Sequence, residues 1–291
     1  MYPNAFSYVR AESVEHALQE LADHGQDARV LAGGCSLIPL MKYRTQTPKV
    51  LIDIGDLEDE LHYVHERDDN LCIGALTRHA DAQIDPAVDA QPVVREVADT
   101  IADVQVRNMG TVLGGVLAVE PTGDWIPPLL ALRGTVLARS VNGQREVAAD
   151  DLVVAPFQNS LRGDELATEV RFPVRAPGSG ASHQKLTIRV NAGVVNCSAG
   201  VTVEDGVIAT VGIGLGALER HPVRAAAAET VLTGQRPEGE VLDEAARAAI
   251  DEVEAFTDAR GEAQFRKAAA AALLKRAVRG AYEQATSEVR V

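Results

Sequence analysis

Near its start, the chain carries apolar residues at the three- and four-residue spacing of an amphipathic helix. Residues 13–25 are predicted to form this helix, with Ser13 as its N-cap and Gly25 as its end. The apolar face consists of Val14, Ala17, Leu18, Leu21 and Ala22. Two strand-like runs follow at Ala28–Leu31 and Val50–Ile54, with a short helix-like run, Ile38–Lys42, between them. About 55 residues therefore predict a small unit of the βαβ type.

Residues 61–172 mix short strands with helices. Strand-like runs stand at Leu71–Gly74, Thr135–Ala138 and Glu169–Phe172, and a helix is predicted at 91–104. The stretch from Pro173 to Ser182 holds two prolines and two glycines but few large apolar residues, which is typical of a domain boundary.

The last third of the chain predicts a sheet followed by helices. The strands are expected at 184–190, 194–203 and 207–215, and Asp205-Gly206 is a strong hairpin turn between the second and third. Helices are expected at 222–233, where Gly234 ends the helix, at 241–255 and at 262–285. The last helix is interpreted as a packing helix with one solvated face, which carries Lys267, Lys275, Arg276 and Arg279.

Composition narrows the class of protein. The 291 residues, 46% of them apolar, suffice for two domains with a large core. A net charge of −14 argues against nucleic acid or an anionic membrane as partner. The longest apolar run, Ala268–Leu274, is too short to span a bilayer, and Met1–Phe6 shows no secretory signal, so we expect a cytoplasmic protein.

The three cysteines, Cys35, Cys72 and Cys197, do not have the spacing of a zinc site or an iron–sulfur cluster. The seven histidines form no His-x-x-x-His pair, and each is interpreted as a surface or satisfied core residue. We therefore predict no metal site on this chain, and any iron–sulfur cluster that it uses must lie on another chain.

Two glycine segments carry the candidate chemistry. The first, Leu31-Ala-Gly-Gly-Cys-Ser-Leu37, joins a predicted strand to a predicted helix, with Ser36 as a candidate cap. The second, Arg107-Asn-Met-Gly-Thr-Val-Leu-Gly-Gly115, is followed by Thr-Gly-Asp124. Either segment alone can be an ordinary turn, with Thr111 as a turn residue and Asp124 as a helix cap. Together, two such segments can hold one diphosphate through backbone N–H groups.

Other glycines and nucleotide motifs add nothing to this picture. Gly212-Ile-Gly-Leu-Gly216 lacks the final glycine and the helix of a dinucleotide fingerprint, and we interpret it as a strand end that allows close packing. No Gly-x-x-x-x-Gly-Lys-Ser/Thr loop for ATP occurs.

Further motifs follow the same order as in a known family. They are Leu51-Ile-Asp-Ile54, Ile73-Gly-Ala-Leu-Thr77, Arg107-Asn-Met-Gly-Thr111 and Glu120-Pro-Thr-Gly-Asp124, then Gln184-Lys-Leu186 and Pro222-Val-Arg224. Over nearly its whole length the chain thus resembles the FAD-binding medium subunit of the molybdenum hydroxylases. This family includes the medium chain of carbon monoxide dehydrogenase and the flavin domain of xanthine dehydrogenase.

The resemblance implies an α+β fold. A two-subdomain FAD-binding domain of the vanillyl-alcohol-oxidase/PCMH type would occupy residues 1–175, with subdomains at about 1–56 and 57–175. A C-terminal domain of antiparallel sheet with helices would occupy residues 180–288. The implied cofactor residues are Leu31, Ala32, Gly33, Gly34, Cys35, Ser36 and Leu37, then Gly110, Thr111, Gly114, Gly115 and Ala118, and also Asp124 near the ribose and Lys185 near the cofactor.

The resemblance also implies a function. The chain would bind one FAD non-covalently and pass electrons from a 2Fe-2S subunit to NAD, a quinone or dioxygen, without a catalytic acid–base pair of its own. A subunit with the molybdenum cofactor would oxidise the substrate, and the complex would be a dimer of heterotrimers. Two alternatives stay open, namely a flavin-deficient scaffold subunit and a self-contained flavin oxidoreductase of the same fold.

The chain departs from the family pattern at several positions. Cys35 stands at a place where a polar side chain is usual, Leu113 precedes a glycine pair displaced by one residue, and Ala167 replaces a common leucine. The family's flavin-shielding aromatic residue is absent, since Asn191-Ala-Gly193 stands there. We therefore predict a more open flavin face near Gly193.

Overall fold

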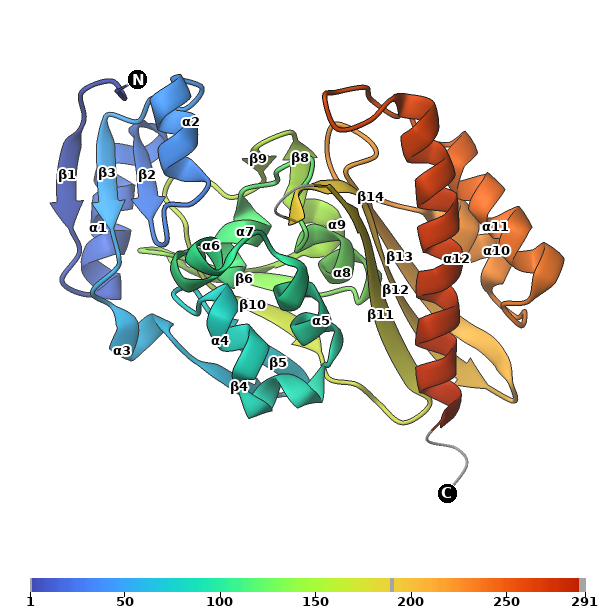
Figure 1. Ribbon diagram of the computed structural model, residues 1–291. Coiled ribbons are helices and arrows are strands. Elements are labelled where there is room, and N and C mark those ends of the chain that lie inside the picture. Colours follow the sequence, from blue (N-terminus) through green and yellow to red (C-terminus); the bar gives the residue numbers. More distant parts are fainter. Residues whose placement is uncertain (1, 189–190, 288–291) are drawn as a thin grey trace.

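The chain folds into three larger sheets arranged side by side and one two-stranded sheet, as the computed structural model of residues 2–188 and 191–287 shows (Figure 1). The first sheet is parallel, with strand order β1-β3-β2. It consists of β1 (Ser7–Arg10), β2 (Ala28–Leu31) and β3 (Val50–Asp53), with α1 (Val14–His24) and α2 (Leu37–Tyr43). The predicted βαβ-type unit is thus confirmed, with β1 as an additional strand.

The second sheet is antiparallel, with strand order β4-β5-β10-β6-β7. Its strands are β4 (Val64–Arg67), β5 (Asn70–Gly74), β6 (Thr135–Ser140), β7 (Gly143–Ala148) and β10 (Leu166–Pro173). The small hairpin β8 (Val153–Ala155) and β9 (Gln158–Asn159) lies apart from this sheet. The accompanying short helices are α3 (Glu58–Leu61), α4 (His79–Ile84), α5 (Val93–Thr100), α6 (Val104–Met109), α7 (Val112–Leu117), α8 (Ile126–Ala131) and α9 (Ala149–Leu152).

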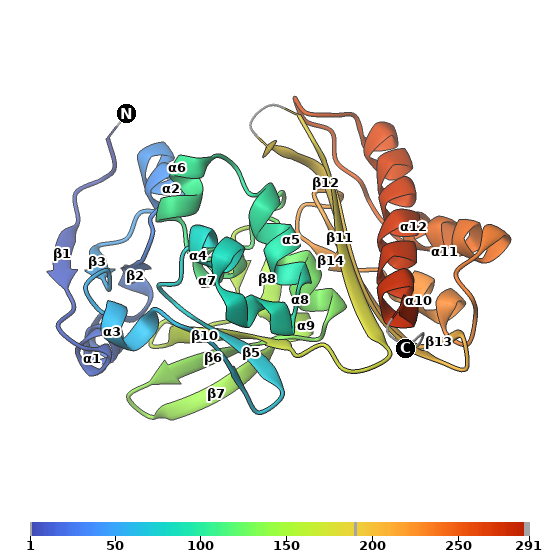
Figure 2. The ribbon, with the colours of Figure 1, turned by 60° about the horizontal axis from the view of Figure 1, so that its bottom comes forward.

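The third sheet is antiparallel, with strand order β11-β12-β13-β14. Its members are β11 (Ser179–Thr187), β12 (Gly193–Glu204), β13 (Val207–Gly216) and β14 (Val223–Arg224), followed by α10 (Ala226–Leu232), α11 (Gly239–Asp251) and α12 (Ala263–Ser287). Helix α12 covers one face of the sheet, and α5 and α8 lie against the other (Figure 2). Asp205 and Gly206 both adopt positive φ, which confirms the predicted hairpin turn.

Glycines let helix α8 approach the third sheet closely. A Cβ atom at Gly212 would lie 2.0 Å from the carbonyl oxygen of Ala131, and one at Gly214 would lie 2.1 Å from that of Pro127. No side chain fits at these positions, so the interpretation of residues 212–216 as a close-packing strand is confirmed. Two separate clusters of buried apolar residues lie on the two sides of this contact.

Several predicted boundaries are wrong. The helix expected at 91–104 is α5, which ends at Thr100. Residue 104 begins a separate helix, α6, whose N-cap Asp103 accepts a hydrogen bond from Val106 N at 2.8 Å. Strand β11 starts at Ser179, inside the expected boundary segment Pro173–Ser182, because its first residues pair with β12. The end of the expected strand 184–190 lies partly outside the described residues.

Among the C-terminal helices, residues 223–224 of the expected helix 222–233 pair with β13 as a strand instead. The helix predicted at 241–255 ends at Asp251. Within residues 2–188 and 191–287, no helix combines the length and apolar character needed to cross a membrane.

Candidate cofactor site

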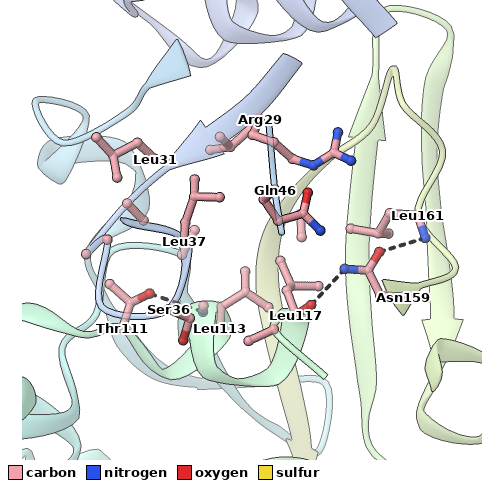
Figure 3. A pocket seen from close by; sticks show the side chains of 18 of the residues that line it. Arg29, Leu31, Ser36, Leu37, Gln46, Thr111, Leu113, Leu117, Asn159 and Leu161 are labelled. Carbon is pink, nitrogen blue, oxygen red and sulfur yellow. Dashed lines mark hydrogen bonds between the residues drawn. The ribbon is translucent and has the colours of Figure 1, made fainter. Parts of the chain in front are cut away.

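A cavity of about 710 Å³ lies where the first and second sheet units meet (Figure 3). Residues 31–37 of the first glycine segment line one wall. The second wall comes from the predicted second segment, and the hairpin β8–β9 closes a third side with residues 156–159. The cavity volume falls within the range of about 300–1,000 Å³ that is usual for ligand pockets.

The two glycine segments touch each other directly. A Cβ atom at Gly33 would lie 2.0 Å from the carbonyl oxygen of Met109 and 2.9 Å from the Cα atom of Gly110. Gly34 adopts a φ of 71°, which a side chain rarely tolerates. The contact therefore requires glycine at position 33, and the turn favours glycine at position 34. Because neither residue has a side chain, their backbone atoms are exposed to the cavity.

The first segment presents backbone donors. Among the described residues, no acceptor meets the N–H groups of residues 33–36. Ser36 is the N-cap residue of α2, as predicted, but its hydroxyl makes no capping hydrogen bond. Several free N–H groups in one turn form a concave anion site of the kind that binds phosphates.

The second segment is helical rather than an open loop. Residues 107–109 end α6, while Gly114 and Gly115 lie inside α7. Thr111 caps α7, because its Oγ1 accepts a hydrogen bond from Gly114 N at 3.1 Å. Gly114 is needed because a Cβ there would lie 2.6 Å from this hydroxyl oxygen.

A histidine and the only tryptophan of the chain stand behind the second segment. Trp125 Nε1–H donates to His79 Nδ1 at 3.2 Å, and the two rings are stacked with centroids 5.8 Å apart. Burial, helped by the charges of Arg107 and Arg78, lowers the pKa of His79 to about 4. A Cβ at Gly115 would lie 2.5 Å from Trp125 Cδ1, so glycine makes room for the indole.

Polar side chains fix the hairpin end of the cavity. Asn159 donates from Nδ2 to Leu117 O at 2.8 Å, which joins the hairpin to the end of α7, and its Oδ1 accepts from Leu161 N at 3.1 Å (Figure 3). Burial raises the pKa of Glu165, but hydrogen bonds from Arg145 and Arg162 outweigh it and hold the value at about 2. This carboxylate thereby anchors the loop at residues 160–165.

Asp124 and Lys185 lie together but do not line the cavity. Lys185 Nζ donates to Asp124 Oδ2 at 2.8 Å and to Thr100 O at 2.9 Å, and Asn196 Nδ2 donates to Asp124 Oδ1 at 2.9 Å. Burial raises the pKa of Asp124, and the Lys185 ammonium partly offsets this. The pair joins β11 to the segment before α8, so Asp124 is not the helix cap considered as an alternative.

Three of the residues that depart from the family pattern lie at the cavity or beside the Asp124–Lys185 ion pair. Cys35 is exposed and lines the cavity, while Leu113 is buried beside it. Gly193 lies next to the ion pair, since a Cβ there would be 3.4 Å from Lys185 Cε. It does not line the cavity, so a more open flavin face near Gly193 stays a prediction.

The cavity therefore unites twelve of the predicted residues, namely Leu31, Ala32, Gly33, Gly34, Cys35, Ser36, Leu37, Gly110, Thr111, Gly114, Gly115 and Ala118. Sequence reasoning missed other lining residues, among them His79, Arg29, Gln46, Asn159 and Arg162. For His79 a weak signal exists, because it follows the motif Ile73–Thr77 by two residues. The other four stand in no motif.

One group of potential metal ligands occurs in the described part of the chain. His65, Cys72 and Glu169 place their ligand atoms within 4.8 Å of one another. Arg67 donates to both oxygens of Glu169, Tyr63 donates to Oε2, and Arg171 donates to Oε1 as a second guanidinium. Two neighbouring cations disfavour a metal ion there, and we assign no metal to this cluster.

The fold and the cavity define a class of protein in which two adjoining glycine segments surround one pocket, an arrangement suited to a dinucleotide cofactor. Residues 4–175 match the family described as "FAD binding domain in molybdopterin dehydrogenase". Residues 190–281 match the "CO dehydrogenase flavoprotein C-terminal domain". The volume and the backbone donors fit the diphosphate and adenosine parts of FAD.

Known relatives span nearly the whole chain. The carbon monoxide dehydrogenase medium chain of Afipia carboxidovorans is 35% identical over 98% of this chain and 99% of its own length. The 6-hydroxypseudooxynicotine dehydrogenase complex subunit alpha of Paenarthrobacter nicotinovorans is 32% identical over 98% and 97%. The solved structure of carbon monoxide dehydrogenase from Hydrogenophaga pseudoflava matches with a TM-score of 0.92 and 34% identity, over 97% of this chain and 99% of that one.

The chain belongs to the family of FAD-binding medium subunits of the molybdenum hydroxylases. It is an oxidoreductase subunit with an α+β fold, and its cofactor is FAD. The family expectation drawn from the ordered motifs is thereby confirmed.

Proposed function

We propose that this chain is the electron-transfer flavin subunit of a heterotrimeric molybdenum hydroxylase. It receives electrons from a 2Fe-2S subunit and delivers them to an external acceptor such as NAD, a quinone or dioxygen. The observation that carries the proposal is the contact between the two glycine segments, which places backbone donors around a cavity of about 710 Å³. The printed names of the relatives, as medium chains or subunits of dehydrogenase complexes, support it.

Within this proposal the residues have distinct tasks. The N–H groups of residues 33–36 hold the diphosphate, and Thr111 keeps α7 in register so that Gly114 and Gly115 stay close to the cofactor. FAD supplies the redox chemistry when bound. Asp124 and Lys185 stay predicted cofactor residues, supported by their position beside Gly193, where the family places its flavin shield.

The partners and the domain division belong to the same proposal. We infer that a 2Fe-2S subunit and a molybdenum-cofactor subunit bind this chain in a dimer of heterotrimers, in the cytoplasm. The division into residues 1–175 and 180–288 is supported by the two separate buried clusters.

The first test is the visible absorption spectrum of the purified full-length chain before and after addition of FAD. We expect a flavin band that corresponds to about one FAD per chain, with FAD identified in the material released by denaturation. Correctly folded chain that neither carries nor takes up FAD would favour the flavin-deficient scaffold subunit instead.

A second measurement separates the proposal from a self-contained flavin oxidoreductase. Tagged chain purified from its own host should carry along stoichiometric 2Fe-2S iron and molybdenum, measured by elemental analysis. Flavin without iron or molybdenum, together with turnover by the chain alone, would contradict the proposal.

A further inference from the structure

The imidazole of His79 stands where the two glycine segments meet. Its side chain is buried, with 5% of the residue exposed, and it lines the cavity. A Cβ atom at Gly110 would lie 2.8 Å from His79 Nε2, and one at Gly115 would lie 3.5 Å from Cε1. The ring therefore lies close to two glycines of the second segment, and one of them, Gly110, is also beside Gly33.

Trp125 fixes the tautomer of this histidine. An indole N–H can only donate, so the His79 Nδ1 atom 3.2 Å away must accept and carries no hydrogen. In the neutral ring the single hydrogen must then sit on Nε2. Because burial and the neighbouring Arg107 and Arg78 keep the pKa of His79 at about 4, the ring is neutral near pH 7.

The resulting Nε2–H donor has no partner within the described residues. The Nε2 atom of His183 also lacks a partner, but that atom is buried in the protein interior, out of reach of any ligand. His79 Nε2 is not sealed in this way, and the residue is part of the cavity wall. Because Nε2–H reaches the cavity, water can accept from it there, and an acceptor of the cofactor would take the place of that water.

We propose that His79 donates a hydrogen bond from Nε2 to the diphosphate of the cofactor, as a side-chain ligand beside the backbone donors of residues 33–36. This inference rests on the proposed function, since it names a further ligand in the same site. The position at the junction of the glycine segments favours the diphosphate over the flavin ring as the acceptor. A neutral donor suits this place because it binds an anion without burying a cation that would itself need a partner.

The test compares three probes, namely FAD, ADP and riboflavin, on the full-length chain freed of flavin. Trp125 is the only tryptophan, so energy transfer from its fluorescence reports binding of FAD and riboflavin, and calorimetry reports ADP. For His79→Ala we expect about 10- to 100-fold weaker binding of FAD and of ADP, as for the loss of a hydrogen bond to a charged group. Riboflavin, which has no phosphate, should bind as before.

His79→Gln is the rescue variant, because its amide can accept from Trp125 and still donate into the cavity. It should bind ADP within about threefold of the unmodified chain, which a purely structural role of the ring would not require. His65→Ala is the matched control, since it removes a partly buried imidazole that does not line the cavity. It should leave the binding of all three probes unchanged.

Unchanged affinity of folded His79→Ala for ADP and FAD would overturn the inference. Equal loss of riboflavin and FAD affinity with unchanged ADP affinity would also overturn it, because the ring of the flavin would then be the partner. Failure of the unmodified folded chain to bind either FAD or ADP is visible before any variant is made, and it would instead overturn the proposed function.

Discussion

At the scale of single residues, Gly33 is the position that allows the two glycine segments of the cofactor site to touch. Its missing side chain permits the contact with Met109, since any Cβ would approach the carbonyl oxygen of Met109 to 2.0 Å. Backbone atoms cannot move aside as the end of a flexible side chain can. A substituent at this position must therefore separate the two segments.

We predict that Gly33→Ala lowers FAD affinity by at least about tenfold and the free energy of unfolding by about 1–3 kcal/mol, as is usual for overpacking. FAD titration followed by visible absorption, and urea denaturation of the apo chain, measure the two effects. Gly234→Ala is the control, because its φ of 79° strains a side chain at a position that does not line the cavity. It should lower stability and leave FAD affinity unchanged, and an equal affinity loss in both variants would refute the prediction.

Single residues also show how far the sequence can predict the site. Glycine motifs are local, so the residues that line the walls could be read directly from residues 31–37 and 110–118. The pairing of His79 with Trp125 spans 46 positions and depends on the bridge that joins Arg78, just before α4, to Thr111, which no local pattern encodes. The same holds for Lys185, whose ammonium meets Asp124 across 61 positions.

At the scale of elements, the contact between α8 and the third sheet depends on strand β13 offering a flat surface. Gly212 and Gly214 supply it by letting backbone carbonyls of α8 lie against the strand. This contact sets the position of Trp125, the residue just before α8, whose indole donates to His79. The arrangement of the sheet and the position of His79 are therefore linked.

We predict that Gly212→Ala lowers the free energy of unfolding by about 1–3 kcal/mol, because its Cβ would lie 2.0 Å from the oxygen of Ala131. Urea denaturation followed by circular dichroism measures the change. Thr210→Ala, at an exposed position of the same strand, is the control and should stay within about 0.5 kcal/mol. Equal stability of the Gly212 and Thr210 variants would show that α8 can shift without cost.

Elements differ in how well the sequence predicts them. The long strands β12 and β13 and helix α1 follow clear patterns, and their predicted positions agree with the structure within one or two residues. The short helices α6, α7 and α8 have six residues each, too few for an apolar period to emerge. Their ends are set by caps such as Asp103 and Thr111, which a search for hydrophobic periodicity does not detect.

At the scale of the whole molecule, two buried histidines couple stability to pH. Burial, together with nearby cations, lowers the pKa of His79 to about 4 and that of His183 to about 3. His183 is a buried residue of β11, and its Nδ1 lies 2.8 Å from the Oγ atom of Ser198, its partner on β12. Burial raises the pKa of Glu96 and of Asp124, and these carboxyl groups act in the opposite direction. Only a comparison of variants isolates the histidines.

The direction of the pH dependence follows from the lowered pKa values of the two histidines. In the unfolded chain the histidines take up a proton near pH 6.5, whereas in the folded chain His79 does so near pH 4 and His183 near pH 3. The contribution of these two histidines to the free energy of unfolding is therefore complete above about pH 6.5 and decreases as the pH falls. Between pH 7 and pH 5 each histidine should remove about 2 kcal/mol from the free energy of unfolding. Urea denaturation of apo His79→Gln should therefore show a decline about 2 kcal/mol smaller than that of the unmodified chain, and His79→Gln combined with His183→Gln one about 4 kcal/mol smaller. Identical declines in all three chains would mean that the imidazoles already take up protons in the folded state, and a protonated His79 could not have the single fixed donor proposed for the cofactor site.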